Sequence, residues 1–238
     1  MFMLHIALSG DKIVQLDGIY LTNTVLATWT AMTLIIALAG LAVFYLKRGA
    51  NNYLVVGSKT FIQSTYNFIN SIVEIPELSW QVLPLIATIF IYIVTANWLG
   101  LVPGFIGAFV IHTKQGIIPI FRSINADLNT TLSMAIVSII LVKILSYRFS
   151  SETKKYLRVK NRFMHLIVMF FEDLSELTRI ISLSFRLTGN VFGGEVLLLI
   201  LSFLLPYFVP VPFMFLEFFI GAFQALVFAV LVLVFVKW

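Results

Sequence analysis

Arg186 is an arginine within the most apolar half of a very apolar chain. An ionised guanidinium at membrane depth costs at least about 2.5 kcal/mol, and arginine does not avoid that cost by losing its proton. Helical spacing places Arg186 on one face with small and polar residues, namely Ser182, Gly189, Asn190 and Gly193. Because Gly189 and Gly193 form a GxxxG pair, a neighbouring helix can approach this face closely. The pattern predicts a partner that carries a carboxylate; the alternatives are an arginine that extends to the membrane surface, or an ion pair that only holds helices together.

Carboxyl and amide side chains lie on both sides of Arg186 along the chain. Glu172 is near a basic loop, whereas Glu195 and Glu217 flank the next turn. Gln224 follows Glu217 by seven residues and shares its helix face. Buried carboxyl groups can hold and exchange a proton, which an arginine cannot do. The pattern therefore indicates two water-accessible paths that the arginine keeps apart.

Asp127 lies in another polar stretch, at the start of an apolar segment. Its charge either stabilises the N-terminus of a helix or lines a polar entrance to the membrane interior. The residues alone leave both interpretations open.

The composition sets the class of protein. Of 238 residues, 60% are hydrophobic and 11% are charged, which excludes an ordinary soluble domain and indicates a polytopic membrane protein. No polar segment is long enough for a separate catalytic domain, so we expect no enzyme activity from this chain alone. With three scattered histidines and no cysteine, we expect neither a metal nor another cofactor. The formal charge of +5 is mostly in loops, where it sets topology and does not imply nucleic acid.

Apolar runs separated by turns predict an all-α polytopic membrane protein with about five membrane-embedded helices and one amphipathic helix. About 20 apolar residues cross a hydrocarbon core of about 30 Å, and a segment that is apolar on one face is expected at the interface. Residues 1–20 are expected to lie outside the bilayer. Residues 103–123 are expected to be irregular and to lie on the outer side. We expect a single membrane domain over residues 1–238, with spans at 21–46, 80–102 and 125–146, the amphipathic helix at 53–75, a long tilted helix at 163–205 and a final helix at 213–237.

The helix expected at 163–205 is too long for an upright span. At about 1.5 Å per residue it reaches about 65 Å, roughly twice the hydrocarbon core. Ordinary mismatch tilt does not absorb that excess. We therefore expect a steeply tilted helix, which Pro206, Pro210 and Pro212 end with a turn, and a returning helix. Such a hairpin can wrap a large partner.

A basic loop sets the expected orientation. Short loops rich in lysine and arginine stay in the cytoplasm. We therefore expect the N-terminus outside and the C-terminus in the cytoplasm. The loop carries one acidic residue, Glu152, against Arg148, Lys154, Lys155, Arg158, Lys160 and Arg162.

Three motifs and the last span closely resemble the a subunit of F-type ATP synthases, the stator of a membrane rotary motor. The motifs are NWLGLVPG at 97–104, NADLNTTLS at 125–133 and SFRLTGNVFGGE at 184–195, and the last span contributes Glu217 and Gln224. The resemblance covers roughly residues 20–238. It implies several transmembrane helices, of which the last two form a tilted hairpin against a rotating c-ring.

The resemblance also implies roles for the polar residues around the arginine. Arg186 matches the arginine that faces a carboxylate of the ring, and Asn190 and Gln224 match its polar neighbours. Thr188 departs from the family pattern, because a bulkier residue often occupies this position.

The resemblance assigns the carboxylates to two offset half-channels. Glu195 and Glu217 match the pair that lines the outer half-channel, and Asp127 matches its entrance. Glu172 matches a carboxylate of the cytoplasmic half-channel. Protons, or sodium ions, would enter from outside, ride on the ring and leave toward the cytoplasm.

The implied partners are the c-ring, the b subunits of the peripheral stalk, the wider F1Fo complex and the lipid bilayer. The implied location is a bacterial cell membrane, with plastid and mitochondrial membranes as alternatives. Three other functions fit the sequence less well. A self-contained proton-coupled transporter would show internal repeats, which the chain lacks. A scaffold would not need the polar hairpin, and an intramembrane protease would need a serine–histidine or paired-aspartate arrangement.

Overall fold

The structure is a computed structural model that describes residues 10, 12–16, 19–49, 52–102, 110–113, 116–149, 162–205 and 208–235. Five of its helices are long and apolar enough to cross a membrane, namely α1, α3, α4, α5 and α6. The predicted all-α polytopic fold class is therefore confirmed. In chain order the elements are β1 (Lys12–Leu16), β2 (Ile19–Thr22), α1 (Asn23–Lys47), α2 (Tyr53–Val73), α3 (Pro76–Leu101), β3 (Val110–Thr113), β4 (Gly116–Pro119), the 3-10 turn η1 (Ile124–Ala126), α4 (Leu128–Phe149), α5 (Arg162–Leu204) and α6 (Pro210–Val234).

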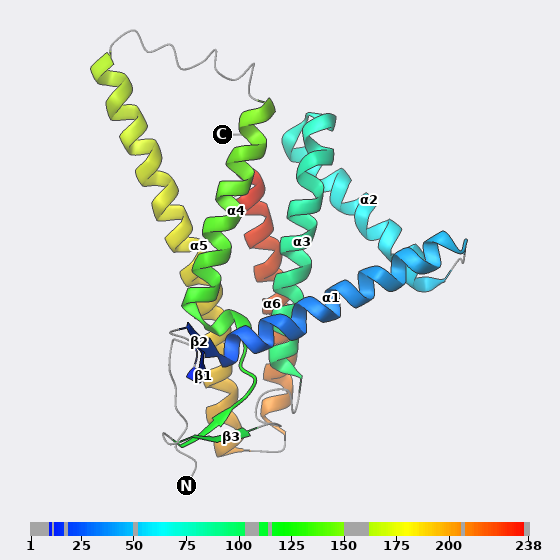
Figure 1. The fold of residues 1–238 in the computed structure, drawn as a ribbon, viewed down its shortest axis with the longest axis vertical. Helices are drawn as coiled ribbons and strands as arrows, with labels where there is room; N and C mark the ends of the chain where they lie inside the picture. Colours follow the sequence, from blue (N-terminus) through cyan, green and yellow to red (C-terminus); the bar gives the residue numbers. More distant parts are fainter. Residues whose placement is uncertain are drawn as a thin grey trace.

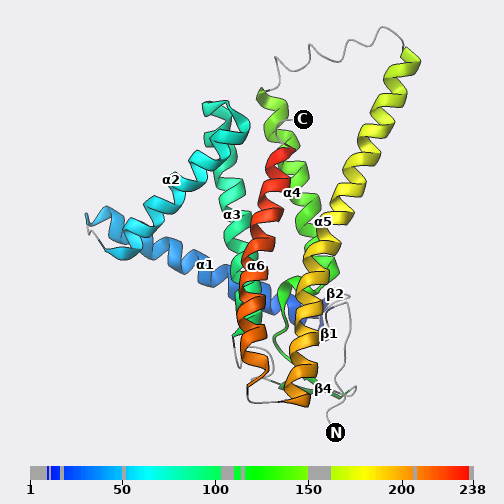
Figure 2. The same ribbon diagram turned by 180° about the vertical axis from the view of Figure 1, so that it is seen from behind.

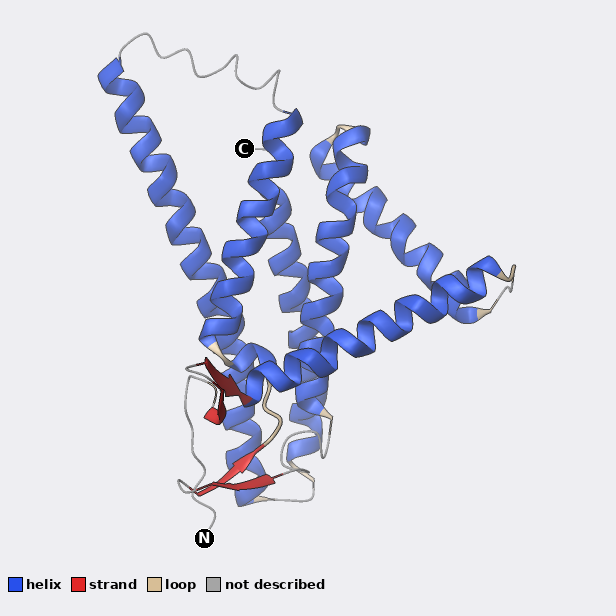
Figure 3. Ribbon diagram, viewed as in Figure 1, coloured by secondary structure: helices blue, strands red, loops and turns tan. Residues whose placement is uncertain are grey.

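Four helices, α3, α4, α5 and α6, form the main bundle, and α1 and α2 form an arm beside it (Figure 1). Helix α1 runs obliquely away from the bundle, and α2 returns to the start of α3 (Figures 1 and 2). The strands lie at one end of the long axis (Figure 3), and the turn between α2 and α3 lies at the other.

The core lies between α3 and α6, with α4 and α5 packed against it. Helices in lipid gain little from the hydrophobic effect, so close van der Waals packing must hold them together. Small side chains on α6 permit that packing, since Ala225 and Ala229 are buried beside Phe228. The buried residues of α3 that complete this core are Leu78, Val82, Leu83, Ile86, Ile89 and Ile93.

Helix α5 is a single helix of 43 residues, from Arg162 to Leu204. Its apolar, membrane-length part is the 28-residue stretch Leu177–Leu204. The helix leans away from α4 toward its own N-terminal end (Figures 1 and 2). Helix α5 is therefore about 65 Å long and inclined, and only its second part, Leu177–Leu204, has the composition of a membrane span.

Helix α6 begins at Pro210, three residues before the expected start. Proline lacks an N–H, but the first residues of a helix have no intrahelical acceptor for that group. Pro210 and Pro212 therefore lie within the first turn of α6 instead of in the connection, whereas Pro206 lies outside the described residues.

The structure contains two antiparallel strand pairs, one before α1 and one within residues 103–123, which were expected to be irregular. Strand β1 pairs with β2, and β3 pairs with β4. Ile13 and Val14 in β1, and Val110 and Ile111 in β3, are β-branched residues that favour extended backbone. Short β-branched runs between long apolar helices are easily missed by a search for membrane spans.

Candidate functional site

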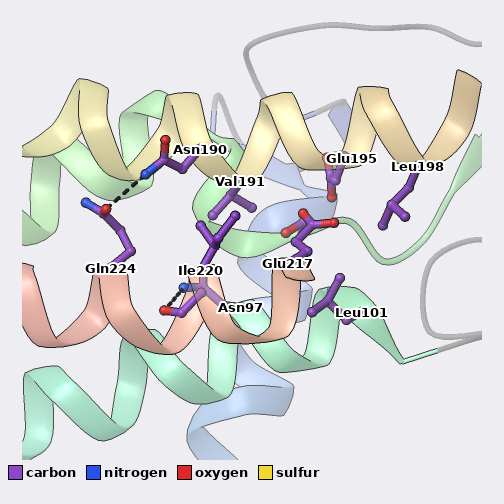
Figure 4. A pocket seen from close by; sticks show the side chains of 12 residues that line it. Asn97, Leu101, Asn190, Val191, Glu195, Leu198, Glu217, Ile220 and Gln224 are labelled. Carbon is purple, nitrogen blue, oxygen red and sulfur yellow. Dashed lines mark hydrogen bonds between the residues drawn. The ribbon is translucent and has the colours of Figure 1, made fainter. Parts of the chain in front are cut away.

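Two glutamates from different helices meet beside a small cavity between α5 and α6. Glu195 of α5 and Glu217 of α6 point toward each other (Figure 4). The cavity has a volume of about 30 Å³. Asn190, Gln224 and Asn97 also line it. The structure therefore brings together four of the residues predicted for proton translocation.

The close approach of Glu217 to α5 depends on Gly194. A Cβ atom on residue 194 would collide with the Glu217 carboxylate. Glu217 also lines a second cavity of about 160 Å³, which lies on the Gly193 side of the same helix pair. Its carboxylate consequently lies against the α5 backbone and borders both cavities.

Glu195 has two neighbours that were not predicted from the sequence. Arg122 and the Ser123 hydroxyl, both just before η1, act on its carboxylate through charge and hydrogen bonding. Ser123 Oγ also lies close to Gly100 of α3, where a Cβ atom would be 2.7 Å away. The sequence feature that could have indicated these neighbours is Arg122, a single arginine shortly before the polar stretch at residues 125–133.

Beyond the glutamates, amide side chains continue the polar surface. Asn190 Nδ2 donates to Gln224 Oε1 at 2.9 Å, which joins α5 to α6 (Figure 4). Gln224 is buried, with 4% of its surface exposed. Asn190 and Gln224, which the resemblance gave only as polar neighbours of Arg186, thus contact each other directly.

A second amide pair fixes the position of α6 relative to α3. Asn125 Nδ2 donates to Asn97 Oδ1 at 2.7 Å, and Asn97 Nδ2 donates to the Gly221 carbonyl at 2.9 Å. One turn away, Trp98 stacks on Phe218 with ring centroids 4.2 Å apart. These contacts hold the helix turn that carries Glu217.

Three buried polar atoms at the cavity have no hydrogen-bond partner among the described residues. They are Glu195 Oε1, Glu217 Oε2 and Gln224 Nε2. Buried polar atoms in proteins are nearly always satisfied by protein or water. A cavity of about 30 Å³ has room for about two water molecules, each of which needs about 10–15 Å³. The site is therefore chemically suited to water.

Arg186 lies outside this cavity, on the exposed face of α5. Ser182, Gly189, Asn190 and Gly193 are exposed with it, so the face predicted from helical spacing is present. Cβ atoms built on Gly189 or Gly193 would meet no atom within 4 Å. Among the described residues, the Arg186 side chain has no hydrogen bond or ion pair. Apart from Asn190, which bonds to Gln224, and Gly193, which borders the second cavity, this face is not used by the packing of the described residues.

Asp127 does not line either cavity. It is buried, with 3% exposed, and its Oδ2 accepts from Thr24 Oγ1 at 3.0 Å and from the Gly10 N–H at 3.2 Å. Its Oδ1 accepts from the Asn129 N–H at 3.0 Å, which caps the start of α4. These contacts tie the N-terminal segment to α4. The side chain of Glu172, the remaining predicted residue, lies outside the described residues.

Comparison with known protein families identifies the chain. A profile of the family described as ATP synthase A chain matches residues 25–237. The chain belongs to this family.

Individual relatives agree with the family match. The chain is 33% identical to the ATP synthase subunit a of Gloeobacter violaceus over 215 residues, which cover 88% of this chain and 80% of the relative. It is 31% identical to the ATP synthase subunit a of Moorella thermoacetica over 231 residues, or 94% of each chain. A third relative, the ATP synthase subunit a of Syntrophobacter fumaroxidans, is 32% identical over 209 residues, which cover 86% of this chain and 78% of the relative.

Family membership fixes the general role. The chain is a membrane subunit of the ATP synthase complex that serves the proton-translocating stator and is not itself catalytic. The predicted resemblance and the predicted absence of catalysis by this chain alone are confirmed at this level.

Proposed function

We propose that the chain provides two offset proton half-channels and that Arg186 faces the carboxylate of a c-ring. The observation that carries the proposal is the division of α5 into two faces. One face lines a polar cavity with Glu195, and the other exposes Arg186 among small residues. A chain that only scaffolds a complex has no need of either.

The outer half-channel consists of the cavity and its two carboxyl groups. Glu195 lies close enough to Glu217 to act electrostatically on its carboxyl group. Water in the cavity would connect them, and a proton would pass between them toward Asn190 and Gln224. Asp127 is the entrance in the sequence prediction, but it lines neither cavity and its contacts at the start of α4 support a structural role, so the proposed path does not include it.

Arg186 would separate this path from the cytoplasmic one. It precedes Glu195 by nine residues, or about 14 Å along the helix, and follows Glu172 by fourteen residues, or about 21 Å. A permanent cation between the two carboxylates repels a proton in transit and attracts an ionised carboxylate on a ring. A protonated ring carboxyl is neutral and can turn through lipid without the cost of a buried charge.

The remaining assignments follow from this arrangement. The c-ring would lie against the exposed small-residue face of α5, and the b subunits of the peripheral stalk would hold the chain against rotation. The transported ion is the proton, with sodium as the alternative. The N-terminus would be outside and the C-terminus in the cytoplasm of a bacterium, because the basic loop at residues 150–161 and Lys47 would both be cytoplasmic.

The test is Arg186→Ala in the whole complex, reconstituted in liposomes. ATP-driven acidification and passive proton leak are measured together, with and without sodium. We expect pumping to be lost and leak to rise, while the amount of assembled complex stays unchanged.

Arg179→Ala is the matched control, because Arg179 is an exposed arginine of the same helix that stacks on Phe235 at 5.1 Å. It should keep pumping. Normal pumping by Arg186→Ala would overturn the proposal. If assembly fails, Arg186→Lys retains a cation of different shape and separates charge from folding. Pumping that requires sodium and resists proton ionophores would show that the transported ion is sodium and not the proton.

A further inference from the structure

Three hydroxyl groups form a buried contact between α4 and α5, on the side of α5 away from Arg186. Thr131 and Ser184 are 0% exposed and Thr188 is 3% exposed. Thr131 Oγ1 and Thr188 Oγ1 are 2.6 Å apart, a short hydrogen bond. Ser184 Oγ contacts the Thr131 carbonyl at 3.4 Å. We call Thr131, Ser184 and Thr188 the hydroxyl contact.

The hydroxyl contact lies opposite the arginine. At 3.6 residues per turn each residue advances about 100°, so the midpoint of Ser184 and Thr188 is about 180° from Arg186. The burial pattern agrees with that calculation. Leu183, Ser184, Leu187, Thr188 and Val191 are buried, whereas the face that carries Arg186 is exposed. Whatever fixes the rotation of α5 at the hydroxyl contact therefore fixes the direction of the guanidinium.

The apolar neighbours alone fix that rotation poorly. Dispersion contacts of leucine and valine are non-directional, whereas a hydrogen bond weakens steeply with distance and angle. A rotation of α5 by about 20° moves an atom about 5 Å from the helix axis by about 2 Å, which breaks the bond between the two threonines. The same rotation moves the arginine by at least as much, because its tip lies farther from the axis.

We propose that Thr131 and Thr188 are positioning residues that set the rotation of α5, and so aim Arg186 at the partner. This inference rests on the proposed function, since it assigns the arginine a partner to face.

The test uses Thr188→Val and Thr131→Val, which remove the bond from either helix with nearly unchanged shape, and Thr188→Ser, which keeps the hydroxyl. Thr33→Val is the matched control, because Thr33 is an exposed threonine of α1 whose hydroxyl bonds only within its own helix. We expect ATP-driven pumping to fall about tenfold in each valine variant, with assembly unchanged. Thr188→Ser and Thr33→Val should pump normally.

A second measurement reads rotation directly. The chain has no cysteine, so Ser182→Cys and Phe185→Cys each give one site on α5 for disulfide formation with a cysteine placed in the ring. These two sites are about 60° apart around the helix. In the Thr188→Val background we expect the ratio of the two cross-link yields to change at least about threefold, because a rotation of α5 turns one site toward the ring and the other away.

The outcomes are distinct. An unchanged ratio of yields, or normal pumping in both valine variants, overturns the inference. Failure of both valine variants to assemble also overturns it, because the hydroxyl contact would then serve folding alone. If Arg186→Ala pumps normally, the proposed function itself fails. If Arg186→Ala is inactive while Thr188→Val pumps normally, only the present inference fails.

Discussion

The substitution Gly194→Ala is predicted to impair proton pumping through Glu217. A Cβ atom on residue 194 would overlap the carboxylate of Glu217, whereas ordinary contact begins at 3.4 Å. The carboxylate must therefore retreat by at least about 1 Å, a displacement that can slow a positioned reaction about 100-fold. The obstructing atoms are the far end of a flexible side chain, so the helices need not separate and assembly should be retained.

The assay is ATP-driven acidification of liposomes that contain the complete complex, normalised to the amount of assembled complex. We expect Gly194→Ala to pump 10- to 100-fold more slowly than the unchanged protein, by the displacement estimate. Gly40→Ala in α1 is the matched control, since its Cβ would meet nothing within 4 Å. The double variant Gly194→Ala with Glu217→Asp should recover part of the rate, because aspartate is shorter by one methylene. Pumping by Gly194→Ala at the normal rate would refute the close packing of Glu217 against α5.

Three further substitutions test the rest of the site. Glu217→Gln replaces a carboxyl group, which can accept and release a proton, by an amide, which cannot, and should slow pumping about 10²- to 10⁴-fold in the same assay. A normal pumping rate would exclude Glu217 from the proton path. Asp127→Ala removes the carboxylate that accepts from the Thr24 hydroxyl and from the Gly10 and Asn129 N–H groups, and should destabilise the protein by about 1–3 kcal/mol. The measured result is less intact complex after graded heating, and unchanged heat resistance would show that these contacts do not stabilise the protein. Gly221→Ala places a Cβ 3.0 Å from Asn97 Cβ and should destabilise the protein by about 1–3 kcal/mol, because it overpacks the contact between α3 and α6. The measured result is a lower yield of assembled complex, and an unchanged yield would contradict this prediction.

The helices and the arginine face could be predicted from the sequence because both depend on periodicity along one chain segment. Hydropathy alone indicates where α1, α3 and α4 lie, since each must be apolar over the width of the bilayer. The face of Arg186, Gly189 and Gly193 follows from the helical repeat, and the structure exposes that face. Neither prediction needs knowledge of which helices are neighbours.

Contacts between segments far apart in the chain could not be predicted in this way. The position of Arg122 and Ser123 beside Glu195 depends on how the segment before η1 packs against α5. The bond between Asp127 and Thr24 joins residues 103 positions apart. Periodicity along one segment does not show which distant segments contact each other, so the neighbours of Glu195 and Asp127 could be identified only in the structure.

The glycines show how one hairpin can serve an internal and an external surface at once. Added Cβ atoms would crowd neighbouring side chains at Gly194 and Gly221, where small residues let α5, α6 and α3 close around the glutamates. At Gly189 and Gly193 the same addition would meet nothing within 4 Å in the described part of the chain. Glycine in a helix costs about 1 kcal/mol relative to alanine, so two that do not assist the described packing require another cause. Under the proposed function, close approach of a partner helix to the exposed arginine face would supply that cause.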